Sequence, residues 1–241
     1  MRTGTSMARR EILARFTLVA VLFMAGCGSS GGDYYPLRPG LSWEYSLKIS
    51  TFDGESRQKQ IVRNLQESNA SGQTVYVQEQ SGNKLSYYRR SPQGIERLST
   101  RNLGEEGGDK DEPDHYLLPL PPTVGANWSL PSHLSLIQSR TYEPADRVTP
   151  GTTKLPLQYE IVSMDETVDV PAGHFTHCLK TRATGKVTIR VDRGNHFADV
   201  EVESYDWYAP GIGLVKSSRV ERSDSHYLQA GEYLLELERM R

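Results

Sequence analysis

Residues 186–203 alternate between apolar and polar side chains with a period of two, and this pattern limits the fold of the 241-residue chain more than any other feature. Successive side chains of a β-strand point to opposite faces, so the pattern predicts strands with one covered face. The apolar positions are Val187, Ile189, Val191, Val200 and Val202. The polar positions are mostly basic before a turn at 193–196 and acidic after it, which favours cross-strand pairing. The sequence therefore predicts a long amphipathic antiparallel hairpin.

Shorter alternating segments, separated by turns of Gly, Asn and Pro, occur through the rest of the chain. The segments expected to be strands are 43–48, 74–80, 84–90, 95–98, 214–217 and 233–238. Residues 143–156 are rich in Pro, Thr and Gly and are expected to form a loop. No long segment after residue 27 has the apolar periodicity of an amphipathic helix. The predicted fold class is all-β.

Tyr205 and Trp207 interrupt the pattern of the hairpin, because they occupy the parity that carries Glu201 and Glu203. Two explanations fit. A β-bulge would shift the phase of the strand, and a change in the covered face would turn the aromatic side chains inward.

The N-terminus has the pattern of a bacterial lipoprotein signal. Four arginines precede an uncharged apolar run at 16–24, which has the length of a secretory h-region and is shorter than the ~20 residues of a membrane-spanning helix. Translation starts at Met1 or Met7. Met24-Ala25-Gly26-Cys27 resembles the lipobox, in which signal peptidase II cleaves before the lipidated cysteine. A signal peptide is therefore predicted at residues 1–26.

Cys27 is expected to carry a diacylglyceryl group and an N-acyl chain such as palmitate, which together suffice for a stable membrane anchor. No other cofactor is expected. Gly28 follows in place of the aspartate that retains lipoproteins at the inner membrane, a resemblance that favours the periplasmic face of the outer membrane in a host with two membranes. Residues 27–33 are then the lipidated cysteine and a Gly/Ser tether, and residues 34–241 are one β-rich domain.

Charge and cysteine content limit the partners and the chemistry of this domain. The whole chain has a formal net charge of −2, and cleavage of the signal removes four arginines and one glutamate. The acidic mature chain is not expected to bind nucleic acid. Of the two cysteines, Cys27 is used by the lipid, so Cys178 has no partner for an intramolecular disulfide.

Three motifs carry a resemblance to a known group of proteins. They are Tyr-Pro-Leu with Gly and Trp-Glu-Tyr at 35–45, Val-Pro-Ala-Gly-His-Phe with Cys at 170–178, and Gly-Ile-Gly-Leu-Val at 211–215. The chain resembles a family of uncharacterised bacterial lipoproteins and secreted proteins with a β-rich domain of unknown function. The resemblance implies a curved antiparallel sheet, similar to the half-barrels of lipoprotein carriers. It supplies no catalytic residues.

His174, His177 and Cys178 place two imidazoles and a thiol close together. A zinc or copper site would need a further ligand such as His196 or His226. A Cys–His hydrolase could use Cys178, His174 and Asp169, although no known nucleophile motif surrounds them. The commoner role of a lone cysteine is a small buried hydrophobe.

The acidic, Gly-rich segment 104–114 is a second candidate site. Asp109, Asp111 and Asp114 could bind calcium, but the spacing of an EF-hand is absent, and a solvated loop is the simpler interpretation.

The sequence therefore favours a non-enzymatic, lipid-anchored envelope protein. It would bind an apolar ligand or an envelope protein partner on a curved β-sheet, either as a carrier with an open cavity or as a scaffold whose own side chains fill the concavity. The alternative is a metal-binding or hydrolytic envelope protein that uses His174, His177 and Cys178.

Overall fold

The computed structural model describes residues 32–70, 73–103, 109–110, 115–140, 153–191 and 196–241. Within it, residues Gly31–Arg241 form one compact unit. The signal segment, Cys27 and most of the acidic segment that contains Asp111 and Asp114 lie outside the described residues, so lipid attachment and calcium binding stay predictions. No helix in the described part of the chain is long and apolar enough to cross a membrane.

The described residues contain strands and no helix, and all their strand pairings are antiparallel, which confirms the predicted all-β class. The strands are β1 (Ser42–Thr51), β2 (Gly54–Asn64), β3 (Ser68–Ala70), β4 (Gln73–Gln80), β5 (Lys84–Arg90), β6 (Gly94–Asn102), β7 (Asp109–Lys110), β8 (Tyr116–Pro119), β9 (Asn127–His133), β10 (Gln138–Ser139), β11 (Lys154–Val170), β12 (Gly173–Arg190), β13 (Phe197–Ala209), β14 (Gly213–Arg222), β15 (Leu228–Gln229) and β16 (Gly231–Met240).

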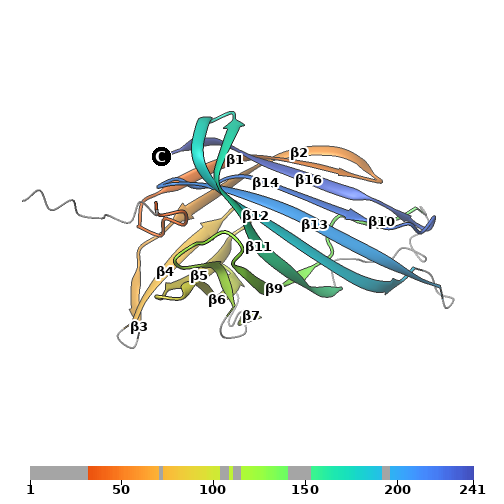
Figure 1. The fold of residues 1–241 in the computed structure, drawn as a ribbon, viewed down its shortest axis with the longest axis horizontal. Helices are drawn as coiled ribbons and strands as arrows, with labels where there is room; N and C mark the ends of the chain where they lie inside the picture. The colour runs from red at the N-terminus through yellow and green to blue at the C-terminus, as the bar shows by residue number, and fades with distance from the viewer. Residues whose placement is uncertain (1–31, 71–72, 104–108, 111–114, 141–152, 192–195) are drawn as a thin grey trace, which may run out of the picture. The chain divides into compact units, whose positions relative to one another are not determined.

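One 14-stranded sheet contains all of these strands except β10 and β15, which pair with each other. Its main path has the order β7-β6-β5-β4-β2-β1-β16-β14-β13-β12-β11-β9, with β3 beside β4 and β8 beside β6. The C-terminal strand β16 therefore lies between β1 and β14, so the two ends of the domain are joined at the centre of the sheet (Figure 1).

The sheet is curved, and the segment between β8 and β9 connects its two ends. β8 pairs with β6 near one end of the sheet, and β9 pairs with β11 at the other. The Leu120 N–H donates to the Gln93 carbonyl, and the Gly125 N–H donates to the Ile161 carbonyl, both at 2.8 Å. The expected curved antiparallel sheet is confirmed. Because one segment contacts both of its ends, the sheet is closer to a closed barrel than the expected half-barrel is.

β11 begins earlier than the sequence indicated. The expected loop at 143–156 gives way to a 17-residue strand from Lys154, although Pro156 lies within it. Two features accommodate the proline: it lies opposite Pro131 of β9, which also lacks an N–H, and the pairing of β11 with β12 begins only at Gln158.

The interior of the sheet is filled at one end by the chain itself. A plug segment, residues 134–137, lies against inward-facing side chains of β11, β12 and β13. The members of this core cluster are Leu134, Ile137, Leu155, Leu157, Ala183, Ile189, Val191, Ala198, Val200, Val202 and Leu228.

A buried ion pair holds the plug segment. The carboxylate of Glu221, which has 0% exposure, accepts the backbone N–H groups of residues 135, 136 and 137 at distances between 2.9 and 3.1 Å. Arg219 pairs with Glu221 at 2.8 Å and donates to the His133 carbonyl at 2.7 Å. Because partners satisfy both charges, this pair can stay in the interior and fix the path of the plug segment.

Candidate functional site

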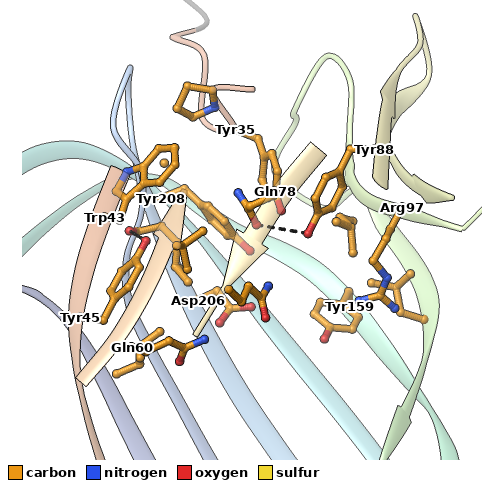
Figure 2. Close-up of a pocket in the computed structure, with 18 residues that line it drawn as sticks. Tyr35, Trp43, Tyr45, Gln60, Gln78, Tyr88, Arg97, Tyr159, Asp206 and Tyr208 are labelled. Atoms are coloured by element: carbon orange, nitrogen blue, oxygen red, sulfur yellow. Dashed lines mark hydrogen bonds between the residues drawn. The ribbon is translucent and has the colours of Figure 1, made fainter. Parts of the chain in front are cut away.

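The other end of the interior contains a cavity of about 280 Å³ (Figure 2). Strands near both ends of the sheet contribute to its wall, with Arg97 from β6 and Leu130 from β9. Its aromatic lining residues are Tyr35, Trp43, Tyr45, Tyr88, Tyr159 and Tyr208. Its polar lining residues are Gln60, Gln78, Gln80, Arg97 and Asp206. The cavity is thus walled mainly by rings, amides and charged groups, with a few aliphatic side chains such as Val62 and Leu130.

Asp206 and Tyr208 face the cavity because they have the same parity as the buried residues earlier in β13. Even-numbered residues of β13 are buried from Ala198 to Ser204, and Asp206 and Tyr208 continue that parity. The pairing of β12 with β13 runs from Phe197 to Tyr208 without a register shift. The β-bulge expected beyond Ser204 is present in the pairing with β14, between Trp207 and Tyr208.

Tyr205 and Trp207 lie on the outer face, with lysines over their rings. The Lys180 ammonium lies 5.2 Å from the Tyr205 ring centroid and 5.1 Å from that of Trp207, and Lys216 lies 5.7 Å from Trp207. These cation–π contacts and the aliphatic lysine stems cover aromatic surface that the sequence alone indicates should be buried.

Asp206 is held in place by its neighbour on β14. Ser217 lies opposite it in the sheet and donates its hydroxyl proton to the carboxylate at 2.5 Å. Because the only hydroxyl proton of Ser217 is used, the Tyr233 hydroxyl, at 3.1 Å, donates to Ser217. Burial raises the pKa of the Asp206 carboxyl, while the Ser217 hydrogen bond and the charge of Arg219 act in the opposite direction.

The tyrosines around Asp206 are neutral phenols. Burial raises the pKa of Tyr45, Tyr159 and Tyr208 above their ordinary value, and that of Tyr233 to about 12. The negative charge of Asp206 adds to the shift of the last three. Tyr45, Tyr159 and Tyr208, which line the cavity, therefore contribute uncharged phenol groups to its wall.

Hydrogen bonds fix several of the lining side chains before any ligand arrives. The Trp43 indole N–H donates to the Ile212 carbonyl at 2.7 Å, and the Tyr45 hydroxyl donates to the Leu214 carbonyl at 2.9 Å. The Tyr88 hydroxyl donates to Gln78 at 3.3 Å (Figure 2). Walls ordered in this way lower the entropy cost of binding.

The residues singled out from the sequence lie elsewhere and do not converge. The imidazole of His174 contacts Asp169 at 2.7 Å, and that of His177 contacts Asp165 at 2.6 Å, with all four side chains more than half exposed. Cys178 is fully buried and takes part in neither pair. Burial and the charge of Glu166 raise the pKa of its thiol to about 11, which disfavours a thiolate nucleophile.

The further ligands considered for a metal site are also not brought to this cluster. The His196 ring stacks on Tyr227 with a centroid distance of 5.6 Å, and the His226 ring contacts Tyr227 at a tilt with a centroid distance of 3.9 Å. In the part of the chain that the structure describes, no three His, Cys, Asp or Glu side chains are grouped so that they could hold a metal ion.

The fold and the site together define an antiparallel β-sheet protein with a tyrosine-rich internal cavity. No family model and no curated protein matches the chain. Two solved structures are similar to it. One is a candidate lipoprotein from Parabacteroides distasonis, with 12% sequence identity and a TM-score of 0.40. The other is a candidate exported protein with a YmcC-like fold from Bacteroides fragilis, with 16% identity and a TM-score of 0.38. Each match covers 87% of this chain and 99% of the other.

Proposed function

We propose that the protein is a lipid-anchored, non-enzymatic component of the bacterial envelope that binds a small ligand inside its curved sheet. The observation that carries this proposal is the cavity of about 280 Å³, whose aromatic and amide walls are held by hydrogen bonds. Concave sites with rigid aromatic walls and a few oriented polar groups are typical of small-molecule binding. Cys27 would hold the domain at the membrane, with the periplasmic face of the outer membrane favoured.

The lining bears on the two kinds of binding expected from the sequence. A cavity of about 280 Å³ lies just below the range of small-ligand pockets, roughly 300–1,000 Å³. Its polar groups would lose hydrogen bonds to water against acyl chains. The plug segment closes the other end of the interior. These features favour a compact ligand with polar groups over the long apolar cargo of a lipid carrier.

The proposal is tested by native mass spectrometry of the full chain purified from a bacterial envelope in detergent. We expect a bound small-molecule mass that is lost on denaturation. Val62→Phe fills part of the cavity and should abolish the bound mass, because Val62 lines it. Val124→Phe is the matched control, since Val124 is 56% exposed and lies outside the cavity lining. A bare mass for the wild-type chain, or equal loss in both variants, would contradict the proposal.

A further inference from the structure

The carboxyl group of Asp206 lies in the cavity wall without a direct counter-charge. Its only hydrogen bond among the described residues comes from Ser217, and it takes part in no ion pair there. A partly buried carboxylate with one neutral donor is costly, because desolvation disfavours the charged form.

The basic groups nearby do not pair with Asp206. Arg219 is bound to Glu221 at 2.8 Å and to the backbone of His133. Arg97 lies on the other side of the cavity, where Figure 2 shows it beside Tyr159 and away from Trp43 and Tyr45. Among the described residues, neither arginine therefore neutralises Asp206 by direct contact.

The surrounding rings also favour a cation. Tyr159 and Tyr208 line the cavity together with Asp206, and the Tyr233 hydroxyl lies 3.1 Å from the Ser217 hydroxyl that donates to the carboxylate. Figure 2 shows Tyr45 and Tyr208 on one side of Asp206 and Tyr159 on the other. Aromatic faces carry partial negative charge and attract cations, most strongly where water is excluded.

We propose that the cavity binds the cationic group of an organic amine or quaternary ammonium compound, with Asp206 as its counter-charge and the tyrosine rings as its cage. This inference rests on the proposed function and names the class of ligand. The ligand cation supplies the positive counter-charge that Asp206 lacks, and the tyrosine rings exclude water from this ion pair.

The test is isothermal titration calorimetry of the full chain, in a non-ionic detergent, with two small probes. Choline carries a quaternary ammonium group, and 3,3-dimethylbutan-1-ol is its neutral carbon isostere, so the pair differs in charge with little change in shape. We expect choline to bind at least about tenfold more tightly, the effect of one charge-assisted contact with cation–π support.

The variants assign that preference to one carboxylate. Asp206→Asn should remove the choline preference and leave the affinity for the neutral isostere unchanged. Asp199→Asn is the control, because Asp199 is an exposed carboxylate paired with Lys186 at 2.9 Å on the outer face, and it should keep the preference.

Equal affinity of the wild-type chain for both probes would overturn the cationic class while leaving the cavity as a ligand site. Binding of neither probe would also overturn it, and the bound mass found by native mass spectrometry would decide the proposed function separately. A choline preference that survives in Asp206→Asn would overturn the role of Asp206. The comparison of probes needs only the wild-type chain, so it stands even where a variant fails to fold.

Discussion

Asp206 shows at the scale of one residue how a binding group can cost stability. Burial among phenol rings raises the pKa of its carboxyl above the ordinary value of 3.8. The folded chain therefore holds the proton more tightly than the unfolded chain. The contribution of Asp206 to stability falls as the pH rises from the ordinary pKa through the raised one, and the full cost is present only above the raised pKa.

Replacement of Asp206 by asparagine should consequently stabilise the fold at pH 7. The amide oxygen can still accept from Ser217, and the charge is gone, so we expect the Tm to rise by a few degrees. The gain should disappear below the ordinary carboxyl pKa. The nearby tyrosines have raised pKa values and remain neutral throughout, and the nearby arginines keep their charge. Thermal denaturation followed by circular dichroism across this pH range measures the effect. A lower Tm at pH 7 would show that the carboxylate is already compensated.

The plug segment shows at the scale of the element how long-range contacts set the interior. Gly231 of β16 lies opposite Glu221 of β14, and the plug segment crosses both. A Cβ atom at Gly231 would come within 2.2 Å of the Leu136 carbonyl oxygen. The missing side chain is therefore what allows the plug segment to approach the sheet.

Gly231→Ala should displace the plug segment and destabilise the fold by about 1–3 kcal/mol, the usual cost of overpacking. Urea denaturation gives the free energy of unfolding, and amide hydrogen exchange at residues 136 and 137 should become faster. Glu232→Ala alters the adjacent exposed position and should leave both quantities nearly unchanged. An unchanged unfolding free energy for Gly231→Ala would mean that the plug segment can shift at no cost.

Strands could be predicted from the sequence wherever one face is apolar, since alternation at residues 187–191 and 200–202 matches β12 and β13. The cavity could not. Ser204 and Asp206 face the interior, yet a polar lining residue has the same appearance in a sequence as a solvated one. Trp207 was misleading in the opposite direction. Its aromatic side chain indicates an interior position, but it lies on the outer face, where lysines cover the ring.

Contacts between distant parts of the chain were equally hidden. Glu221 meets the plug segment across 84 to 86 positions of sequence, and no local pattern reports such a contact. The same holds for the β8–β9 connection that brings the ends of the sheet together. His174, His177 and Cys178 are close in sequence but do not converge. Each imidazole pairs with its own exposed aspartate, and the thiol of Cys178 is buried.

At the scale of the whole molecule, we expect the folded domain to bind the ligand and the lipid anchor to fix its location. Among the described residues, three hydrophobic core clusters are built from residues between 34 and 240. A Gly/Ser tether of six residues spans only ~13 Å, which would keep the cavity close to the membrane surface. The anchor would therefore determine where in the envelope the protein binds its ligand, and the cavity would determine which ligand it binds.

Cys27→Ser separates these two roles. It should release the chain from the membrane fraction into the soluble envelope fraction, because the acyl chains provide the attachment. The Tm and the affinity for choline should match those of the wild-type chain. Cys178→Ser is the control for the loss of a thiol. It should stay membrane-bound but be less stable, since Cys178 is fully buried in an apolar cluster and a hydroxyl there lacks the packing of the sulfur. Membrane fractionation with mass spectrometry of the N-terminal peptide measures the first effect. A Cys27→Ser chain that remained in the membrane fraction would place the attachment in the domain itself and remove the lipid anchor from the proposed function.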